Sequence, residues 1–113
     1  MITIKPTRYY SDRQEKQVAK AIKGKQTSNS GATGFQKGDI LTDEWLIECK
    51  TTMTPKKSFS IKKEWLSKNK REMFEMGKSY NALAFNFEPD GDNYYVIDER
   101  LFKKVKELLE NEL

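Results

Sequence analysis

The spacing of apolar and polar residues changes several times along the chain. In three segments the apolar residues recur every three or four positions, which is the period of an amphipathic helix. In the shorter segments between them they alternate or form unbroken runs, as they do in strands. The predicted elements are a helix over 11–23, strands over 25–29, 38–41 and 45–52, a helix over 60–76, strands over 80–87 and 93–97, and a helix after Asp98. This order, αβββαββα, predicts an α/β domain in which helices flank a central mixed sheet.

The first predicted helix carries a carboxylate on its apolar face. Glu15 precedes Val18, Ala19 and Ile22 by three, four and seven positions, so it lies on the same stripe. Burial of a carboxylate is costly without a partner. Two interpretations stay open: Glu15 lies at the edge of the stripe and reaches water, or it points over the sheet toward a functional site. Gly24 is the predicted end of this helix.

The second and third predicted strands form a hairpin that brings charged residues together. Asp39 lies on the first of the two, and Glu48 and Lys50 lie on the second. Because side chains alternate between the faces of a strand, Glu48 and Lys50 share one face, while the Cys49 side chain points the other way into the core. Two carboxylates that lie close together repel each other unless a cation joins them. The hairpin therefore predicts a divalent metal site with a lysine beside it.

Mg²⁺ is the metal that suits these residues, because it prefers oxygen ligands and keeps several waters. Asp39 and Glu48 would supply two carboxylates, and the backbone carbonyl of Cys49 would supply a third oxygen. A bound Mg²⁺ lowers the pKa of a water and offsets charge on a phosphate. Lys50 would orient or help to deprotonate that water, or stabilise the charge of the transition state, and the sequence leaves both roles open.

The residue types that are missing narrow the chemistry further. The chain has 113 residues, no histidine and one cysteine. These counts exclude Ser-His-Asp and Cys-His catalysis, histidine-ligated zinc, four-cysteine zinc sites and iron–sulfur clusters. The length predicts one domain over 1–113. No apolar run approaches the roughly 20 residues of a membrane-spanning helix, and residues 1–6 lack the apolar core of a signal peptide. We therefore expect no membrane association and a cytoplasmic protein, in the host cytoplasm if it is viral.

Positive charge is concentrated between residues 56 and 78. This segment has eight basic and three acidic residues, a difference of +5, whereas the whole chain has a net charge of +4. A basic stripe beside an acidic metal site favours polyanion binding, although a lysine-rich face that is simply solvated fits the same pattern. The candidates for contacts with a DNA backbone are Lys56, Lys57, Lys62 and Lys63.

Two further predictions concern packing. Trp65, on the second predicted helix, is expected in the core rather than on the surface as a platform for base stacking. The last helix is expected to pack against the rest of the fold through Leu101, Val105, Leu108 and Leu109.

The hairpin residues resemble the motif of the PD-(D/E)xK nuclease superfamily. Asp39, Glu48 and Lys50 occupy its three positions, and Gly38 stands where the motif has proline. The order of helices and strands is similar to the core of that superfamily. The resemblance therefore implies a restriction-endonuclease-like fold and a metal-dependent endodeoxyribonuclease that hydrolyses phosphodiester bonds with Mg²⁺, for which Mn²⁺ would substitute.

The chain is more specifically similar to the archaeal-type Holliday-junction resolvases. Those proteins carry an acidic residue on the first helix, matched here by Glu15, and a Ser-Gly pair before the aspartate, matched by Ser30-Gly31. The resemblance covers roughly residues 11–97. It implies that Glu15 takes part in the site, directly or through a metal-bound water. Ser30 would touch the scissile phosphate or, equally, satisfy backbone groups in a turn.

Three functions follow from these residues. The leading one is a structure-selective DNA endonuclease that resembles Holliday-junction resolvases. The others are a nicking, flap or restriction-type nuclease that acts on duplex or single-stranded DNA, and a basic DNA-binding module without catalysis. The resemblance also implies a homodimer, because a four-way junction has near-twofold symmetry. The last helix or a sheet edge would supply the dimer interface.

Overall fold

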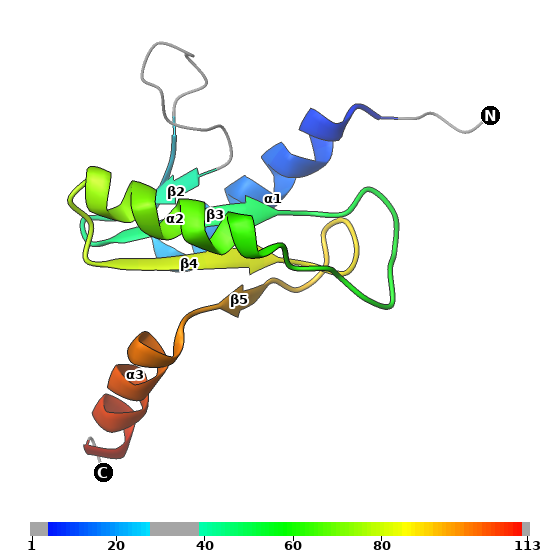
Figure 1. Ribbon diagram of the computed structural model, residues 1–113. Helices are drawn as coiled ribbons and strands as arrows, with labels where there is room; N and C mark the ends of the chain where they lie inside the picture. The colour runs from blue at the N-terminus through cyan, green and yellow to red at the C-terminus, as the bar shows by residue number, and fades with distance from the viewer. Residues whose placement is uncertain (1–4, 28–38, 112–113) are drawn as a thin grey trace.

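The computed structural model describes residues 5–27 and 39–111, which form a five-stranded mixed sheet and three helices (Figure 1). The α/β class and the order of the elements agree with the prediction. In chain order, the elements are α1 (Thr7–Ile22), β1 (Lys25–Gln26), β2 (Asp39–Leu41), β3 (Trp45–Lys50), α2 (Lys63–Glu75), β4 (Tyr80–Phe85), β5 (Tyr94–Val96) and α3 (Glu99–Asn111).

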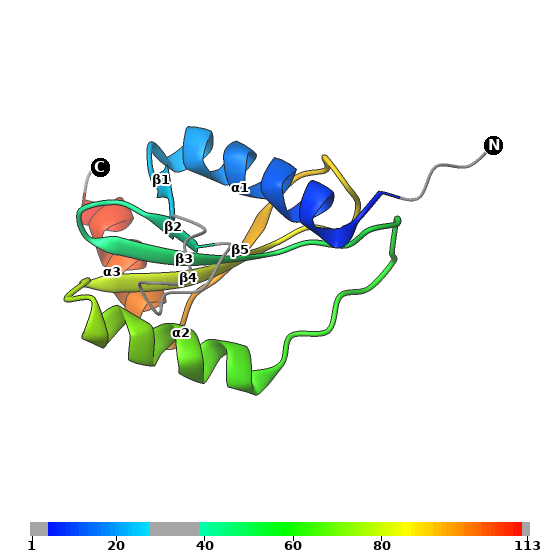
Figure 2. The same cartoon turned by 90° about the horizontal axis from the view of Figure 1, so that it is seen from above.

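The strands lie in the sheet in the order in which they occur along the chain, β1-β2-β3-β4-β5. Neighbouring strands are antiparallel except β3 and β4, which are parallel and are joined by α2. Figure 2 shows α1 on one face of the sheet and α2 on the other. The sheet is therefore the middle of three layers. None of the described helices is long and apolar enough to cross a membrane.

The two faces of the sheet are packed differently. On the α1 face, Val18 lies against a buried apolar cluster of Ile40, Ile47, Ala82 and Ala84. The opposite side chains of the same strands face α2. They include the fully buried Leu46 and Leu83, and they also include the charged residues of the hairpin. The apolar face fixes the register of the strands, and the register in turn fixes where the charged residues meet.

The end of α1 differs from the prediction. The residue with a left-handed backbone is Lys23, with φ 58° and ψ 43°, and not Gly24. The need for glycine at position 24 is steric, because a Cβ there would lie 2.6 Å from Cγ2 of Ile40 and 3.0 Å from the Leu41 carbonyl oxygen. Gly24 thus lets the chain pass close to β2 rather than terminating the helix.

The prediction for the last helix is wrong for Leu108 and Leu109, which are 67% and 61% exposed. Leu101 and Val105 are half-buried, and Leu101 lines a hollow together with residues of α2 and β4, but none of the residues of α3 is fully buried. In Figure 1, α3 lies beyond the β5 edge of the sheet and covers neither of its faces. The apolar period of the sequence identified the helix and its stripe, but α1 and α2 already cover the two faces of the sheet.

Candidate functional site

The centre of the candidate site is a pair of carboxylates on neighbouring strands. Asp39 of β2 lies directly opposite Glu48 of β3, and their side chains are 1% and 4% exposed. Opposite residues of antiparallel strands alternate between pairs that exchange backbone hydrogen bonds and pairs that do not. The Thr42 amide donates to the Trp45 carbonyl, so Thr42 and Trp45 are a hydrogen-bonded pair. Three positions further along, Asp39 and Glu48 are therefore a non-hydrogen-bonded pair, in which Cα atoms approach to about 4.5 Å and side chains are closest. The predicted convergence of these two residues is thereby explained.

Each of these carboxylates has a buried oxygen without a hydrogen-bond partner among the described residues, Oδ2 of Asp39 and Oε2 of Glu48. Buried carboxylate oxygens normally have a partner. No group of three or more His, Cys, Asp or Glu side chains in the ranges 5–27 and 39–111 is arranged to hold a metal ion. Mg²⁺, however, is commonly held by only one or two protein carboxylates together with waters and substrate phosphates. The Asp39–Glu48 pair fits such an ion.

The electrostatics of the pair reflect its burial. The pKa of Asp39 is raised from the usual 3.8 to about 8, chiefly by burial and then by the nearby carboxylates of Glu72 and Glu48, while Lys68 opposes the shift. The pKa of Glu48 is also raised, chiefly by burial, and Lys50 and Lys68 oppose that shift. The ionised forms of both carboxylates are therefore destabilised in this site. A divalent cation would relieve that cost.

Lys50 lies on the same face of β3 as Glu48, as predicted. Its Nζ lies 4.5 Å from the centre of the Trp65 ring on α2, at a distance typical of a cation–π contact. Trp65 is half-buried and packs against Phe59, with ring centres 6.2 Å apart. The indole is therefore only partly in the core, where the sequence predicted it to lie, and its exposed part contacts the ammonium group of Lys50 at the edge of the site.

Two residues of α2 belong to the site and were not singled out from the sequence. Lys68 places its Nζ 3.9 Å from Oε1 of Glu48 and 4.0 Å from Oε1 of Glu72. Glu72 is 7% exposed and is the strongest charged influence on the pKa of Asp39. A sequence feature could have identified Glu72: it adjoins Met73 and follows Trp65 by seven positions, so it lies on the inward stripe, as Glu15 does on α1.

Glu15 is buried on α1, with 1% of its surface exposed, so the interpretation in which it reaches water is wrong. Its two oxygens are engaged: Gln26 donates to Oε1 at 3.3 Å, and Arg8 lies 3.3 Å from Oε2. Burial raises the pKa of Glu15. Its charge also raises the pKa of Asp39, but less than Glu72 and Glu48 do. Glu15 thus lies near the carboxylate pair, on the helix that covers the other face of the sheet.

The Cys49 side chain packs against the apolar cluster on the α1 face, as predicted. Burial raises the pKa of its thiol. The backbone carbonyl of Cys49 is a predicted metal ligand. It follows Glu48, which pairs with Asp39 in the last described pair of β2 and β3.

Buried amide side chains fix the end of β3 at which Lys50 lies. Nε2 of Gln14 on α1 donates to the carbonyl oxygen of Lys50 at 2.7 Å and to the Asn93 side chain at 3.0 Å. Just beyond the strand, the buried Asn86 accepts hydrogen bonds from the Thr51 hydroxyl at 2.9 Å and from the Thr52 amide at 3.2 Å. These contacts tie the end of β3 that carries Lys50 to α1 and to the segment after β4.

The four lysines predicted to contact DNA are all exposed. Lys56 and Lys57 lie in the connection between β3 and α2, Lys62 is the N-cap residue of α2, and Lys63 is its first residue. Ser30 lies outside the described residues.

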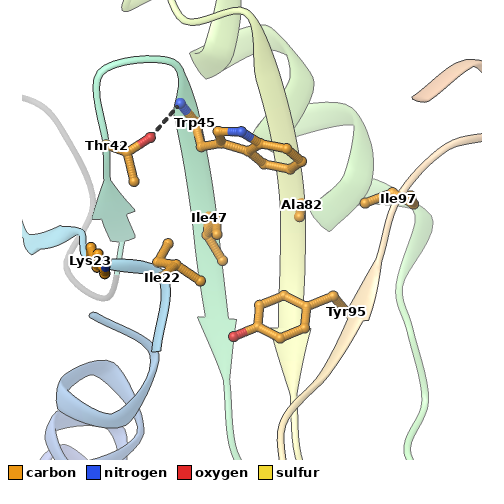
Figure 3. Close-up of a pocket in the computed structure, with 8 residues that line it drawn as sticks. All are labelled: Ile22, Lys23, Thr42, Trp45, Ile47, Ala82, Tyr95 and Ile97. Carbon is orange, nitrogen blue, oxygen red and sulfur yellow. Dashed lines mark hydrogen bonds between the residues drawn. The ribbon is translucent and has the colours of Figure 1, made fainter. Parts of the chain in front are cut away.

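A separate cavity of about 420 Å³ lies on the α1 face of the sheet (Figure 3). Its walls are mainly apolar side chains, among them Ile22, Trp45, Ile47, Tyr95 and Ile97. It holds no carboxylate, and the charged pair lies on the other face. The chemistry described above therefore belongs to the α2 side of the sheet.

No protein-family model matches this chain, and no curated protein and no solved structure shows significant similarity to it.

Proposed function

We propose that this protein is a Mg²⁺-dependent DNA endonuclease with a restriction-endonuclease-like fold, structure-selective and similar in activity to Holliday-junction resolvases. The observation that carries the proposal is the buried pair Asp39 and Glu48, each with an oxygen that lacks a partner among the described residues, next to Lys50 on the same face. Carboxylates, a lysine and a divalent ion are suited to phosphodiester hydrolysis. The arrangement of β1, β2 and β3 as an antiparallel set, followed by α2 and the parallel β4, supports the same proposal.

In this proposal Asp39, Glu48 and the carbonyl of Cys49 hold the Mg²⁺, which lowers the pKa of a water and offsets phosphate charge. As an ammonium group beside Trp65, Lys50 would orient the attacking water or stabilise the transition-state charge, and it would deprotonate that water only as the neutral amine.

The remaining residues of the proposal act around this centre. Glu15 influences the site from α1, and Ser30 contacts the scissile phosphate. Lys56, Lys57, Lys62 and Lys63 bind the DNA backbone, which positions the substrate without reading its sequence. Mn²⁺ substitutes for Mg²⁺.

We also propose that the enzyme is a cytoplasmic homodimer, so that two sites face the two strands of a branched DNA. The exposed apolar residues of α3, Leu108 and Leu109 among them, supply a surface for that contact.

The test is a cleavage assay with Mg²⁺ on four-way junction, flap, duplex and single-stranded DNA. The wild-type protein should make symmetric paired cuts in the junction. Asp39→Ala, Glu48→Ala and Lys50→Ala should each lower the rate about a hundredfold or more. Asp43→Ala is the matched control, because Asp43 is an exposed carboxylate in the turn of the same hairpin and should cut normally.

Circular dichroism should show that all four variants fold. Full cleavage by any one of the three site variants would remove that residue from the mechanism. Cutting of flap, duplex or single strands with no preference for the junction would favour a general nuclease, and no cleavage on any substrate would refute the proposal.

A further inference from the structure

A groove of about 620 Å³ opens along the first half of α2, beside the candidate site. Four of the residues that line it are basic and one, Glu64, is acidic. The basic residues are Lys50, Lys63, Lys68 and Arg71. They come from the end of β3 and from successive turns of α2, so the groove leads from the exposed start of the helix toward the carboxylate pair.

Lys68 connects this groove to the site. Its side chain is 27% exposed and lines the groove, while its Nζ lies 3.9 Å from Oε1 of Glu48. Glu72, one turn further along α2, lies 4.0 Å from the same ammonium group. Lys68 is thus held between a proposed metal ligand and a second buried carboxylate, with part of its surface open to a ligand in the groove.

We propose that the groove binds the phosphates of the DNA strand that enters the Asp39–Glu48 site, with Lys68 as the innermost phosphate-binding residue. The inference rests on the proposed nuclease function and names the path of its substrate. Lys68 and Lys50 both line the groove, and Lys68 also contacts Glu48, so their ammonium groups are available to a phosphate that enters the groove beside the carboxylate pair. Lys63 and Arg71 extend the same positive charge along the groove. Arg71 follows Lys68 by three positions, the spacing of side chains on one helix face, and it also lies 4.0 Å from Glu75 at the exposed surface.

If DNA binds in the groove, basic residues that line it should contribute to binding, whereas basic residues elsewhere on α2 should not. Lys70 lies on the same helix, two residues from Lys68, but its ammonium group faces Asp98 at 3.8 Å and lines the hollow next to α3. Lys68 and Lys70 therefore have the same charge and the same helical setting on different sides of α2. They form a matched pair for an experiment.

The experiment is DNA binding measured by fluorescence anisotropy in EDTA, with labelled duplex and four-way junction DNA at several salt concentrations. Each phosphate contact contributes about 0.9 to the slope of log K against log salt for duplex DNA. Lys63→Gln, Lys68→Gln and Arg71→Gln should each reduce the slope by about that amount. Lys70→Gln should leave the slope unchanged.

Equal slopes for Lys68→Gln and Lys70→Gln would overturn the inference, and so would failure of the wild-type protein to bind either DNA at low salt. Lys63 and Arg71 are exposed, so their variants keep the experiment decisive if Lys68→Gln does not fold. Unchanged slopes for both of these variants would also overturn the proposal that the groove binds phosphates. The binding assay needs no cleavage. Groove-dependent binding without cleavage would refute the nuclease alone, whereas cleavage with unchanged slopes would refute the groove alone.

Discussion

At the scale of single residues, the site is defined by carboxylates placed where their charge is costly. Asp39 and Glu48 are almost fully buried, face each other across two strands, and have Glu72 beside them. Among the described residues, Lys68 is the one whose ammonium group forms ion pairs with this cluster, to Glu48 and to Glu72. Such an arrangement lowers the stability of the metal-free protein at the pH at which the site would work.

The pH dependence of stability tests this cost. The pKa of Asp39 is about 8 in the folded protein and near 3.8 when exposed. The folded state therefore binds the Asp39 proton more tightly than the unfolded state does. The stability that this protonation contributes is fully present below about pH 4 and is lost as the pH rises through about 8. One pKa unit corresponds to about 1.4 kcal/mol, so the loss between these limits is on the order of a few kcal/mol.

We expect Asp39→Asn to flatten this profile without abolishing it, because the pKa values of Glu48 and Glu15 are raised as well. The measurement is urea unfolding in EDTA at intervals from pH 5 to pH 9. Asp43→Asn, at the exposed turn, should follow the wild-type profile. If Asp39→Asn and Asp43→Asn gave parallel curves, Asp39 would not carry the proposed cost.

At the scale of elements, the position of β2 depends on how α1 ends. The helix terminates at Lys23 in a left-handed conformation, and Gly24 then passes against Ile40, the residue next to Asp39. The sequence favoured Gly24 as the terminator because glycine is the residue most often found there. Its actual role depends on a strand that lies sixteen positions later in the chain, which local pattern alone does not reveal.

Substitutions at these two positions should have opposite effects. Gly24→Ala should lower the free energy of unfolding by about 1–3 kcal/mol, because the added Cβ overpacks against Ile40 and the Leu41 carbonyl. Lys23→Gly should raise it by up to about 1 kcal/mol, since glycine adopts positive φ without a steric cost. Urea unfolding measures both changes. A loss of stability in Lys23→Gly, or none in Gly24→Ala, would contradict this account of the turn.

At the scale of the whole molecule, α3 is the element without a place in the layers. Its apolar residues Leu101, Phe102, Val105, Leu108 and Leu109 lie on one side of the helix, and Phe102, Leu108 and Leu109 are more than half exposed. An exposed apolar stripe of this kind commonly marks an interaction surface. The proposed homodimer would use it.

Analytical ultracentrifugation tests that use of α3. The wild-type protein should sediment as a dimer, and the double variant Leu108→Glu, Leu109→Glu should sediment as a monomer. The free energy of unfolding of the variant monomer should change by no more than about 0.5 kcal/mol, because both side chains are exposed. Lys103→Glu, on the polar side of the same helix, is the control. A monomeric wild-type protein, or a double variant that still pairs, would exclude this interface.

The sequence by itself determined the types and order of the helices and strands, because hydrophobic period and turn residues act locally. It also determined that Glu48 and Lys50 share one face, because side chains alternate along a strand. It predicted Asp39 on that face only if the two strands pair as a hairpin, and the observed register, with Asp39 opposite Glu48, meets that condition. The sequence placed Glu15 on the apolar stripe of α1, but only the structure decided that it is buried there.

Only the tertiary structure decided which other elements meet at that face. It brought Lys68 and Glu72 of α2 to the carboxylate pair, gave Trp65 its contact with Lys50, and left α3 outside the layers. These contacts join residues far apart in the chain. They depend on the crossover from β3 to β4, which places α2 against the charged face of the sheet, and a crossover is set by the packing of whole layers rather than by any local pattern.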